Sequence, residues 1–251
     1  MYKRQLETPA IGFIGIEKIE FNYVDGDGDT GYSSTDFYVT QYNETVGTIS
    51  GETLVGDAES DLIFGLAGDD TIDGAGADDF IRGGEGNDSI LGGTGDDVLQ
   101  GGSGDDVLTG GSGDDVIFGG AGDDRINGGS GNDSLVGGDG IDIFALESGD
   151  EGTVGTPAVD TIADFTVGVG GDVLDLSDML QGEESAPLDG FLNFSYDAVS
   201  GDTTISVDVD GSSGTEQQIV LSGIDLTAGG TLTNADILNN LLTDGNLVVD
   251  Q

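Results

Sequence analysis

The stretch from Gly92 to Asn127 is GGTGDDVLQ GGSGDDVLT GGSGDDVIF GGAGDDRIN, four copies of one nine-residue unit. The same unit runs ten times in tandem from Gly56 to Ala145, with no insertion or gap between the copies. Its pattern is Gly-Gly-x-Gly-x-Asp-x-U-x, in which U is a large apolar residue. A fixed short period of this kind predicts a solenoid, in which each repeat packs on its neighbours, rather than a globular domain.

The two parts of the unit predict different structures. Glycines at positions one, two and four permit positive φ, so the first six positions predict a tight turn. The apolar residue at position eight, with one residue on either side, predicts a short strand with one inward side chain. The predicted inward residues are Ile63, Ile72, Ile81, Ile90, Leu99, Leu108, Ile117, Ile126, Leu135 and Phe144. Two units make one coil of 18 residues, so successive coils stack as parallel strands.

Stacking of the coils brings the aspartates at position six into two columns. One column is predicted to hold Asp61, Asp79, Asp97, Asp115 and Asp133, and the other Asp70, Asp88, Asp106, Asp124 and Asp142. Carboxylates about 5 Å apart repel one another. A hard divalent cation between consecutive turns removes this repulsion, and calcium accepts about six to eight carboxylate and carbonyl oxygens. We therefore predict a calcium-dependent fold; a disordered linker, the alternative, has no reason to keep an apolar residue at position eight.

The units resemble the RTX (repeats-in-toxin) nonapeptide, which forms a calcium-binding parallel β-roll. The resemblance implies that the position-six aspartates are the side-chain ligands of several calcium ions, roughly six to eight, with turn carbonyls completing each site. The implied carbonyls belong to Gly83, Gly92, Gly101, Gly110, Gly119 and Gly128. The first units depart from the pattern, since those from Gly56 and Gly74 lack glycine at the second and fourth positions. These departures weaken the prediction for Asp61 and Asp79.

Composition excludes several functions. The chain of 251 residues carries 50 Asp and Glu against 5 Lys and Arg, a net charge of −45, which argues against nucleic acid as a partner and favours cations. It has no Cys and no His, which excludes Ser-His-Asp and Cys-His catalysis and an HExxH zinc site. No apolar run approaches the ~18 residues that a membrane span requires. We expect a monomer that is not an enzyme and has no membrane span.

Residues 1–46 are predicted to form a separate N-terminal region. EKIEFNYVD and STDFYVTQY predict two strands of a hairpin around DGDGDTG, and this pattern resembles the last hairpin of an immunoglobulin-like adhesin repeat. The cluster Asp25, Asp27 and Asp29 is similar to an EF-hand loop, but Thr30 stands where that loop needs glycine. A solvated turn is therefore the favoured interpretation. The β-roll is predicted over residues 47–145, where the unit from Gly47 is a degenerate cap without a ligand.

Residues 146–251 are predicted to form a cap, because an open solenoid end is an edge that aggregates. Asp160, Asp164, Asp172 and Asp175 alternate with apolar residues, which indicates short strands; turn and cap chemistry is their favoured role, with calcium binding as the alternative. Residues 191–223 predict three strands, and TNADILNNLL predicts a short helix with Thr233 or Asn234 as N-cap. The fold class is therefore all-β: a calcium-binding parallel β-roll with a β-rich cap and a short terminal helix.

The block from Asp142 through ADILNNLL resembles the type I secretion target domain at the end of giant RTX adhesins. This implies an export signal read by an ABC transporter, a membrane-fusion protein and an outer-membrane channel. The implied protein is a secreted or cell-surface module at the C-terminus of an adhesin of a Gram-negative bacterium, unfolded in the cytosol and folded outside by calcium. Two alternatives stay open: the C-terminal module of a secreted protease, lipase or epimerase, and an RTX ligand-binding module. The second needs a regular outward ladder of Thr and Asn, whereas position three varies.

Overall fold

The computed structural model describes residues 23–24, 30–31, 43–153, 155–180, 188–209 and 214–249. The chain divides into two compact units, Met1–Gln41 and Tyr42–Gln251. In the first unit, β1 (Tyr23–Val24) pairs antiparallel with β2 (Thr30–Gly31). The predicted strand at residues 34–42 and the EF-hand-like aspartates between β1 and β2 lie outside the described residues.

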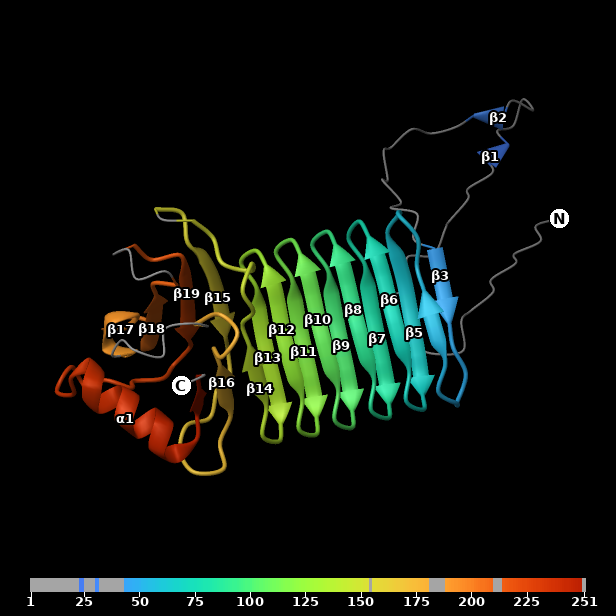
Figure 1. Ribbon diagram of the computed structural model, residues 1–251. Helices are drawn as coiled ribbons and strands as arrows, with labels where there is room; N and C mark the ends of the chain where they lie inside the picture. The colour runs from blue at the N-terminus through green and yellow to red at the C-terminus, as the bar shows by residue number, and fades with distance from the viewer. Residues whose placement is uncertain are drawn as a thin grey trace. The chain divides into compact units, whose positions relative to one another are not determined.

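The second unit contains a parallel β-solenoid whose strands alternate between two sheets (Figure 1). The solenoid strands of the first sheet are β3 (Asn43–Val46), β5 (Asp61–Ala67), β7 (Phe80–Glu85), β9 (Val98–Ser103), β11 (Val116–Ala121) and β13 (Ser134–Asp139). Those of the second are β4 (Thr53–Val55), β6 (Thr71–Gly76), β8 (Ser89–Thr94), β10 (Val107–Ser112), β12 (Arg125–Ser130) and β14 (Ile143–Ala145). Equivalent residues of neighbouring coils pair in register, as Val98 does with Phe80 and Val116. The predicted parallel stacking is confirmed, and β3 is its first strand.

The strands are longer than the sequence pattern predicted. Each strand from β6 to β13 runs through positions seven to nine of one unit and one to three of the next, as β9 does, so only positions four to six remain for the turn. The prediction of a six-residue turn was wrong because the glycine pair stays in the β-ladder: Gly102 pairs with Gly84 and Gly120. Gly102 does so at a φ of +124°, a conformation that residues with a Cβ rarely adopt.

Three residues of the first units adopt a positive φ without being glycine. They are Leu66 (φ +81°), Ala75 (φ +76°) and Ala77 (φ +69°), and each stands where the unit has glycine at position two or four. The left-handed conformation costs a residue with a Cβ roughly 1–2 kcal/mol. The N-terminal coils therefore keep the shape of the repeat at a cost that the later coils do not carry.

The core of the solenoid is a file of single apolar side chains between the two sheets. All ten predicted inward residues are buried, with exposed fractions of 2 % or less, which confirms the assignment of position eight. The same core continues into the C-terminal region through Ile162, Leu174 and Leu176. One large apolar residue for every nine gives each coil little hydrophobic burial of its own.

Both sheets continue past β14 without a break. β15 (Ala158–Ile162) pairs in parallel with β13, and β16 (Val173–Asp175) pairs in parallel with β14. β19 (Gln217–Leu221) then extends the first sheet beside β15, and β20 (Leu247–Val248) ends the second sheet beside β16. The residues after 145 thus cover the end of the solenoid with further strands of the same two sheets (Figure 1).

The three strands predicted in residues 191–223 are present. β17 (Leu192–Asp197) follows a short 3₁₀ helix, η1 (Leu188–Gly190), and pairs antiparallel with β18 (Asp202–Val207). β18 in turn pairs antiparallel with β19. This meander forms the outer end of the first sheet.

The predicted helix is α1 (Asn234–Asp244). Thr233 is its N-cap, in a capping box with Asp236, and Gly245 ends it in the left-handed conformation. Its buried residues, Ile237, Leu238 and Leu241, join the hydrophobic core. In the described part of the chain, no helix is long and apolar enough to cross a membrane.

Candidate metal-binding columns

The position-six aspartates form two columns, one at each set of turns, as the 18-residue coil predicted. All ten are buried, with exposed fractions of 3 % or less. Within each column, the backbone N–H of one aspartate donates to Oδ1 of the aspartate one coil further on, at 2.7–2.9 Å. The side chains therefore tie consecutive coils together in addition to the β-ladders.

The second carboxylate oxygen, Oδ2, is buried without a hydrogen-bond partner in nine of the ten aspartates. The exception is Asp61, whose Oδ2 accepts the N–H of Asp57 at 2.8 Å. Asp79, which shared the weakened prediction with Asp61, does have an unpartnered Oδ2. A buried carboxylate oxygen without a partner is costly, and either a proton or a cation removes that cost.

Each unpartnered Oδ2 lies close to the glycine at position one of its own unit. A Cβ added to Gly92 would lie closer than 3.0 Å both to Asp97 Oδ2 and to the carbonyl oxygen of Gly110, one coil further on. A Cβ on Gly110 would meet Asp115 Oδ2 and the carbonyl of Gly128 in the same way. Position one therefore suits only glycine, because a carboxylate and a carbonyl oxygen, the ligand types that calcium prefers, lie within 3.0 Å of the place of a Cβ.

Five of the six implied carbonyls lie close to the position-one glycine of the preceding coil. They belong to Gly83, Gly92, Gly110, Gly119 and Gly128. Beside Gly83 the three nearest atoms all belong to Asp88, so the carbonyl of Gly101 is not among them. These glycines lie in strands rather than in turns, because the ladder runs through position three of each unit.

The carboxylates of the columns are spread along the solenoid rather than gathered at points. Within the ranges that the structure describes, no three acidic side chains converge as they would around a metal held by side chains alone. A cation in a column would therefore take most of its ligands from backbone carbonyls and water. Calcium tolerates such a mixed and irregular set of oxygens better than magnesium does.

Burial raises the pKa of the column carboxyls from Asp79 to Asp142. The pKa rises to about 7 for Asp79, Asp106, Asp115 and Asp133. It rises to about 6 for Asp97, Asp124 and Asp142. The N–H donated to Oδ1 opposes this rise in pKa, and repulsion from neighbouring carboxylates adds to it. Without a cation, the fold therefore disfavours the charged form of these carboxyls near neutral pH.

The sequence analysis missed a second ladder, at position five. Asp96 Oδ1 accepts the N–H of Asp114, and Asp105 Oδ1 accepts the N–H of Asp123, both at 2.9 Å. These side chains are exposed, and they accept from the coil that follows, opposite to the position-six bonds. The signal was present, since position five is Asp or Asn in eight of the ten units. This ladder uses side-chain oxygens for structure and leaves no buried oxygen unpartnered.

The columns end differently at the two ends of the solenoid. Glu52 occupies position six of the unit from Gly47, and its N–H donates to Asp70 Oδ1 at 2.7 Å. Its own carboxylate turns back to the N–H and hydroxyl of Thr48, so it offers no unpartnered oxygen. At the other end, Asp164 accepts the N–H groups of Gly137 and Gly138. This capping role is the favoured interpretation of Asp164.

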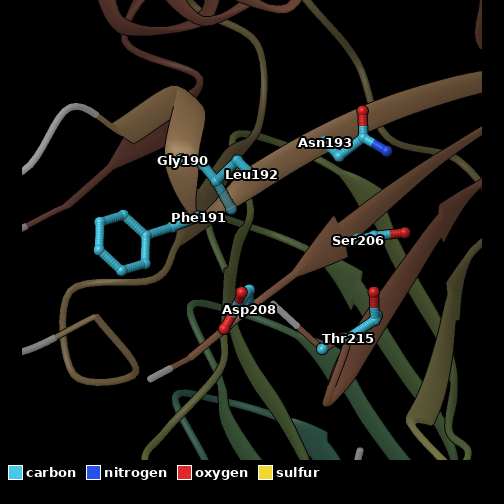
Figure 2. A pocket seen from close by; sticks show the side chains of 8 residues that line it. Gly190, Phe191, Leu192, Asn193, Ser206, Asp208 and Thr215 are labelled. Carbon is cyan, nitrogen blue, oxygen red and sulfur yellow. The ribbon is translucent and has the colours of Figure 1, made fainter. Parts of the chain in front are cut away.

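Figure 2 shows a pocket in the C-terminal region. Asn193, Ser206, Asp208 and Thr215 supply its polar lining, together with the η1–β17 junction. None of its lining residues is a column aspartate. The pocket therefore adds no ligand to the candidate metal sites.

Comparison with known proteins agrees with the repeat geometry. The family model of the RTX calcium-binding nonapeptide repeat matches four times, over residues 46–81, 73–108, 82–117 and 109–144. The chain therefore carries RTX calcium-binding nonapeptide repeats over most of the solenoid. No curated protein matches the chain.

Three solved structures are similar to the chain at low identity. The AlgE6R2 subunit of the Azotobacter vinelandii mannuronan C5-epimerase is 21 % identical, over 84 % of this chain and 94 % of that one, with a TM-score of 0.34. The AlgE6R3 subunit of that epimerase is 19 % identical, over 80 % of each chain, with a TM-score of 0.26. The extracellular lipase LipA of Serratia marcescens is 18 % identical, over 84 % of this chain but 40 % of the lipase, with a TM-score of 0.36. Similarity at this level carries no argument about function.

Proposed function

We propose that the chain is a calcium-dependent folding module, whose solenoid folds when calcium fills the two columns. The observation that carries this proposal is the set of nine buried Oδ2 atoms without partners. The position-six aspartates and the position-one glycine carbonyls would hold the ions. When bound, calcium supplies the positive charge that 5 Lys and Arg cannot supply to 50 Asp and Glu.

The chain's own residues explain why the fold depends on an ion. Each strand buries a single large apolar side chain, so the core contributes little per coil. The glycines at positions one and two of each unit increase the conformational entropy of the unfolded chain, which folding must overcome. The weak core must also offset the cost of the two columns of buried carboxylates, whose charge the metal-free fold disfavours. Neutralising these carboxylates shifts the folding equilibrium toward the folded state.

We further propose that the module serves export, as the C-terminal part of a secreted RTX adhesin. In this proposal, the calcium-poor cytosol leaves the chain unfolded for a type I secretion system, and calcium outside the cell folds it. Support comes from the acidic repeats and from the resemblance of residues 142–242 to type I secretion target domains. We propose no catalytic role, since the chain has no His and no Cys.

Replacing Asp106 by Asn tests the proposal through two effects of opposite sign. Asn keeps an oxygen for the N–H of Asp88, which donates to Asp106 Oδ1 at 2.7 Å, but it removes the buried charge. In EDTA the Asp106→Asn protein should fold more readily than the wild type, because the pKa of Asp106 near 7 shows that its charge is disfavoured there. In calcium, calorimetry should show weaker binding, by about tenfold at the affected sites, which corresponds to about 1.4 kcal/mol.

Asp105→Asn is the matched control. It removes the same charge from the neighbouring residue, which is exposed and keeps an oxygen acceptor for Asp123 N–H. We expect it to leave both the calcium affinity and the metal-free stability close to wild type. Equal effects of the two substitutions would show that only the total charge matters, and would sink the assignment of position six as the ligand.

A further inference from the structure

Both aspartate columns continue one step beyond the repeats, into the C-terminal region. Asp133 N–H donates to Asp160 Oδ1, and Asp142 N–H donates to Asp172 Oδ1, each at 3.0 Å. These are the same bonds that join consecutive coils, although the sequence separation changes to 27 and 30 residues. Asp160 and Asp172 are buried like the column aspartates, with exposed fractions of 4 %.

Asp160 and Asp172 differ from the nine column aspartates from Asp70 to Asp142 in the partner of Oδ2. Asp160 Oδ2 accepts from Gln217 Nε2 at 2.7 Å, and Asp172 Oδ2 accepts the N–H of Thr166 at 2.7 Å. In the repeats the equivalent oxygen is unpartnered from Asp70 to Asp142. At Asp160 and Asp172, protein donors therefore bind the carboxylate oxygen that the repeats leave for a cation.

Side-chain amides also fix the segments that carry these donors. Gln217, on β19, has an exposed fraction of 1 %. Asn246, equally buried, donates through Nδ2 to the carbonyl of Asp172 at 2.6 Å and accepts the N–H of Gly168 at 2.7 Å. Neutral amides thus contact the last aspartate of each column, while Gln217 Oε1 is itself buried without a partner.

We propose that Gln217 and the Thr166 N–H end the columns by taking the place of a cation, so that residues 158–249 keep their fold when calcium is absent. This inference rests on the proposed calcium-dependent folding of the solenoid. The folded end presents Asp160 Oδ1 and Asp172 Oδ1 as acceptors for Asp133 and Asp142.

At the N-terminal end, Asp61 Oδ2 likewise has a protein donor, the N–H of Asp57 at 2.8 Å. Glu52 directs its carboxylate to Thr48 within its own unit, and Leu66, Ala75 and Ala77 hold strained positive φ angles. Glu52 and Asp61 therefore need no cation, but the strained φ angles of the first repeats make these coils less stable than the later ones.

Hydrogen exchange on the full chain separates this inference from the function on which it rests. In EDTA at about pH 7.5 we expect slow exchange in β15, β19 and α1 and fast exchange from β5 to β13, with calcium slowing exchange in both regions. Fast exchange throughout in EDTA would overturn the inference and leave calcium-dependent folding intact. Slow exchange throughout in EDTA would instead overturn calcium-dependent folding.

Gln217→Glu tests the role of the amide directly. It places a second carboxylate beside Asp160 Oδ2, so in EDTA the protection of β15 and β19 should fall by at least about tenfold. Calcium should restore it, because an ion can then occupy the new pair of carboxylates. Gln218→Glu is the matched control, since Gln218 lies on the opposite, less buried face of the same strand, and it should keep its protection in EDTA. Equal loss in the two variants, or loss in Gln217→Glu that calcium does not restore, would show that Gln217 is needed only for packing.

Discussion

Acidification of the metal-free protein, from about pH 7.5 to about pH 5, is expected to increase its folded fraction. The reason lies in the column carboxyls, whose pKa in the folded chain is about 7 for Asp106 and Asp115 and about 6 for Asp97 and Asp124. The pKa of an unfolded aspartate is about 3.9. Between these values the folded chain binds more protons than the unfolded chain, so stability rises as the pH falls.

Because folding raises the pKa of these carboxyls, their protonation stabilises the folded chain only at low pH. The stability that protonation gives is fully present below about pH 4 and is lost as the pH rises through 6 to 7. Protons and calcium should therefore substitute for each other, and the apparent calcium affinity should fall as the pH drops below about 7. Circular dichroism and hydrodynamic radius in EDTA across this range measure the effect. A folded fraction that falls, or stays constant, on acidification would contradict it.

Gly102→Ala is expected to destabilise the solenoid severely. Gly102 has a φ of +124°, and a Cβ there would collide with the backbone carbonyl of Gly84 in the preceding coil. The φ strain alone costs on the order of 1–3 kcal/mol, and the collision adds to it because a β-ladder holds the opposing carbonyl. We expect a loss of about 3 kcal/mol or more, measured as a higher calcium concentration for folding and a lower Tm.

Gly76→Ala is the control for loss of glycine as such. Gly76 lies at position three of its unit, has no positive φ, and its added Cβ would approach only the hydroxyl of Thr94 at 3.1 Å. Other units carry Ala, Ser or Thr at this position. The substitution should leave folding within about 0.5 kcal/mol of wild type. If Gly102→Ala were equally mild, position two of this coil would accommodate a Cβ by a change of φ, as it does at Leu66 and Ala75, and the predicted collision would be wrong.

The periodic part of the fold could be predicted because each unit repeats one physical requirement. Position eight is always apolar and proves buried, as Ile81 and Leu108 show, and position six is always Asp and forms the columns. Strand length could not be predicted from the same pattern. Glycine pairs usually indicate a turn, and only the neighbouring coils reveal that Gly101 and Gly102 remain in the ladder.

The site was harder to predict than the fold. The repeat period predicted which aspartates form the columns, but it did not predict the different roles of their two oxygens. Oδ1 accepts a hydrogen bond from the adjacent coil, while Oδ2 is left for a cation or a proton. For Asp160 and Asp172 the sequence favoured turn and cap chemistry, with calcium binding as the alternative, because the period breaks before them. Only the three-dimensional register shows that they occupy the next positions of the columns, and only tertiary packing brings Gln217 from β19 to Asp160.

The most direct test of the account is a calcium titration of the EDTA-treated full chain near neutral pH. Far-UV circular dichroism and hydrodynamic radius are followed together, with magnesium as the control ion. The account predicts a cooperative gain of β-structure with compaction in calcium and little change in magnesium, because the irregular oxygen sites suit calcium. A compact β-fold that persists in EDTA at neutral pH would contradict the central claim, since the buried carboxylates would then need no cation.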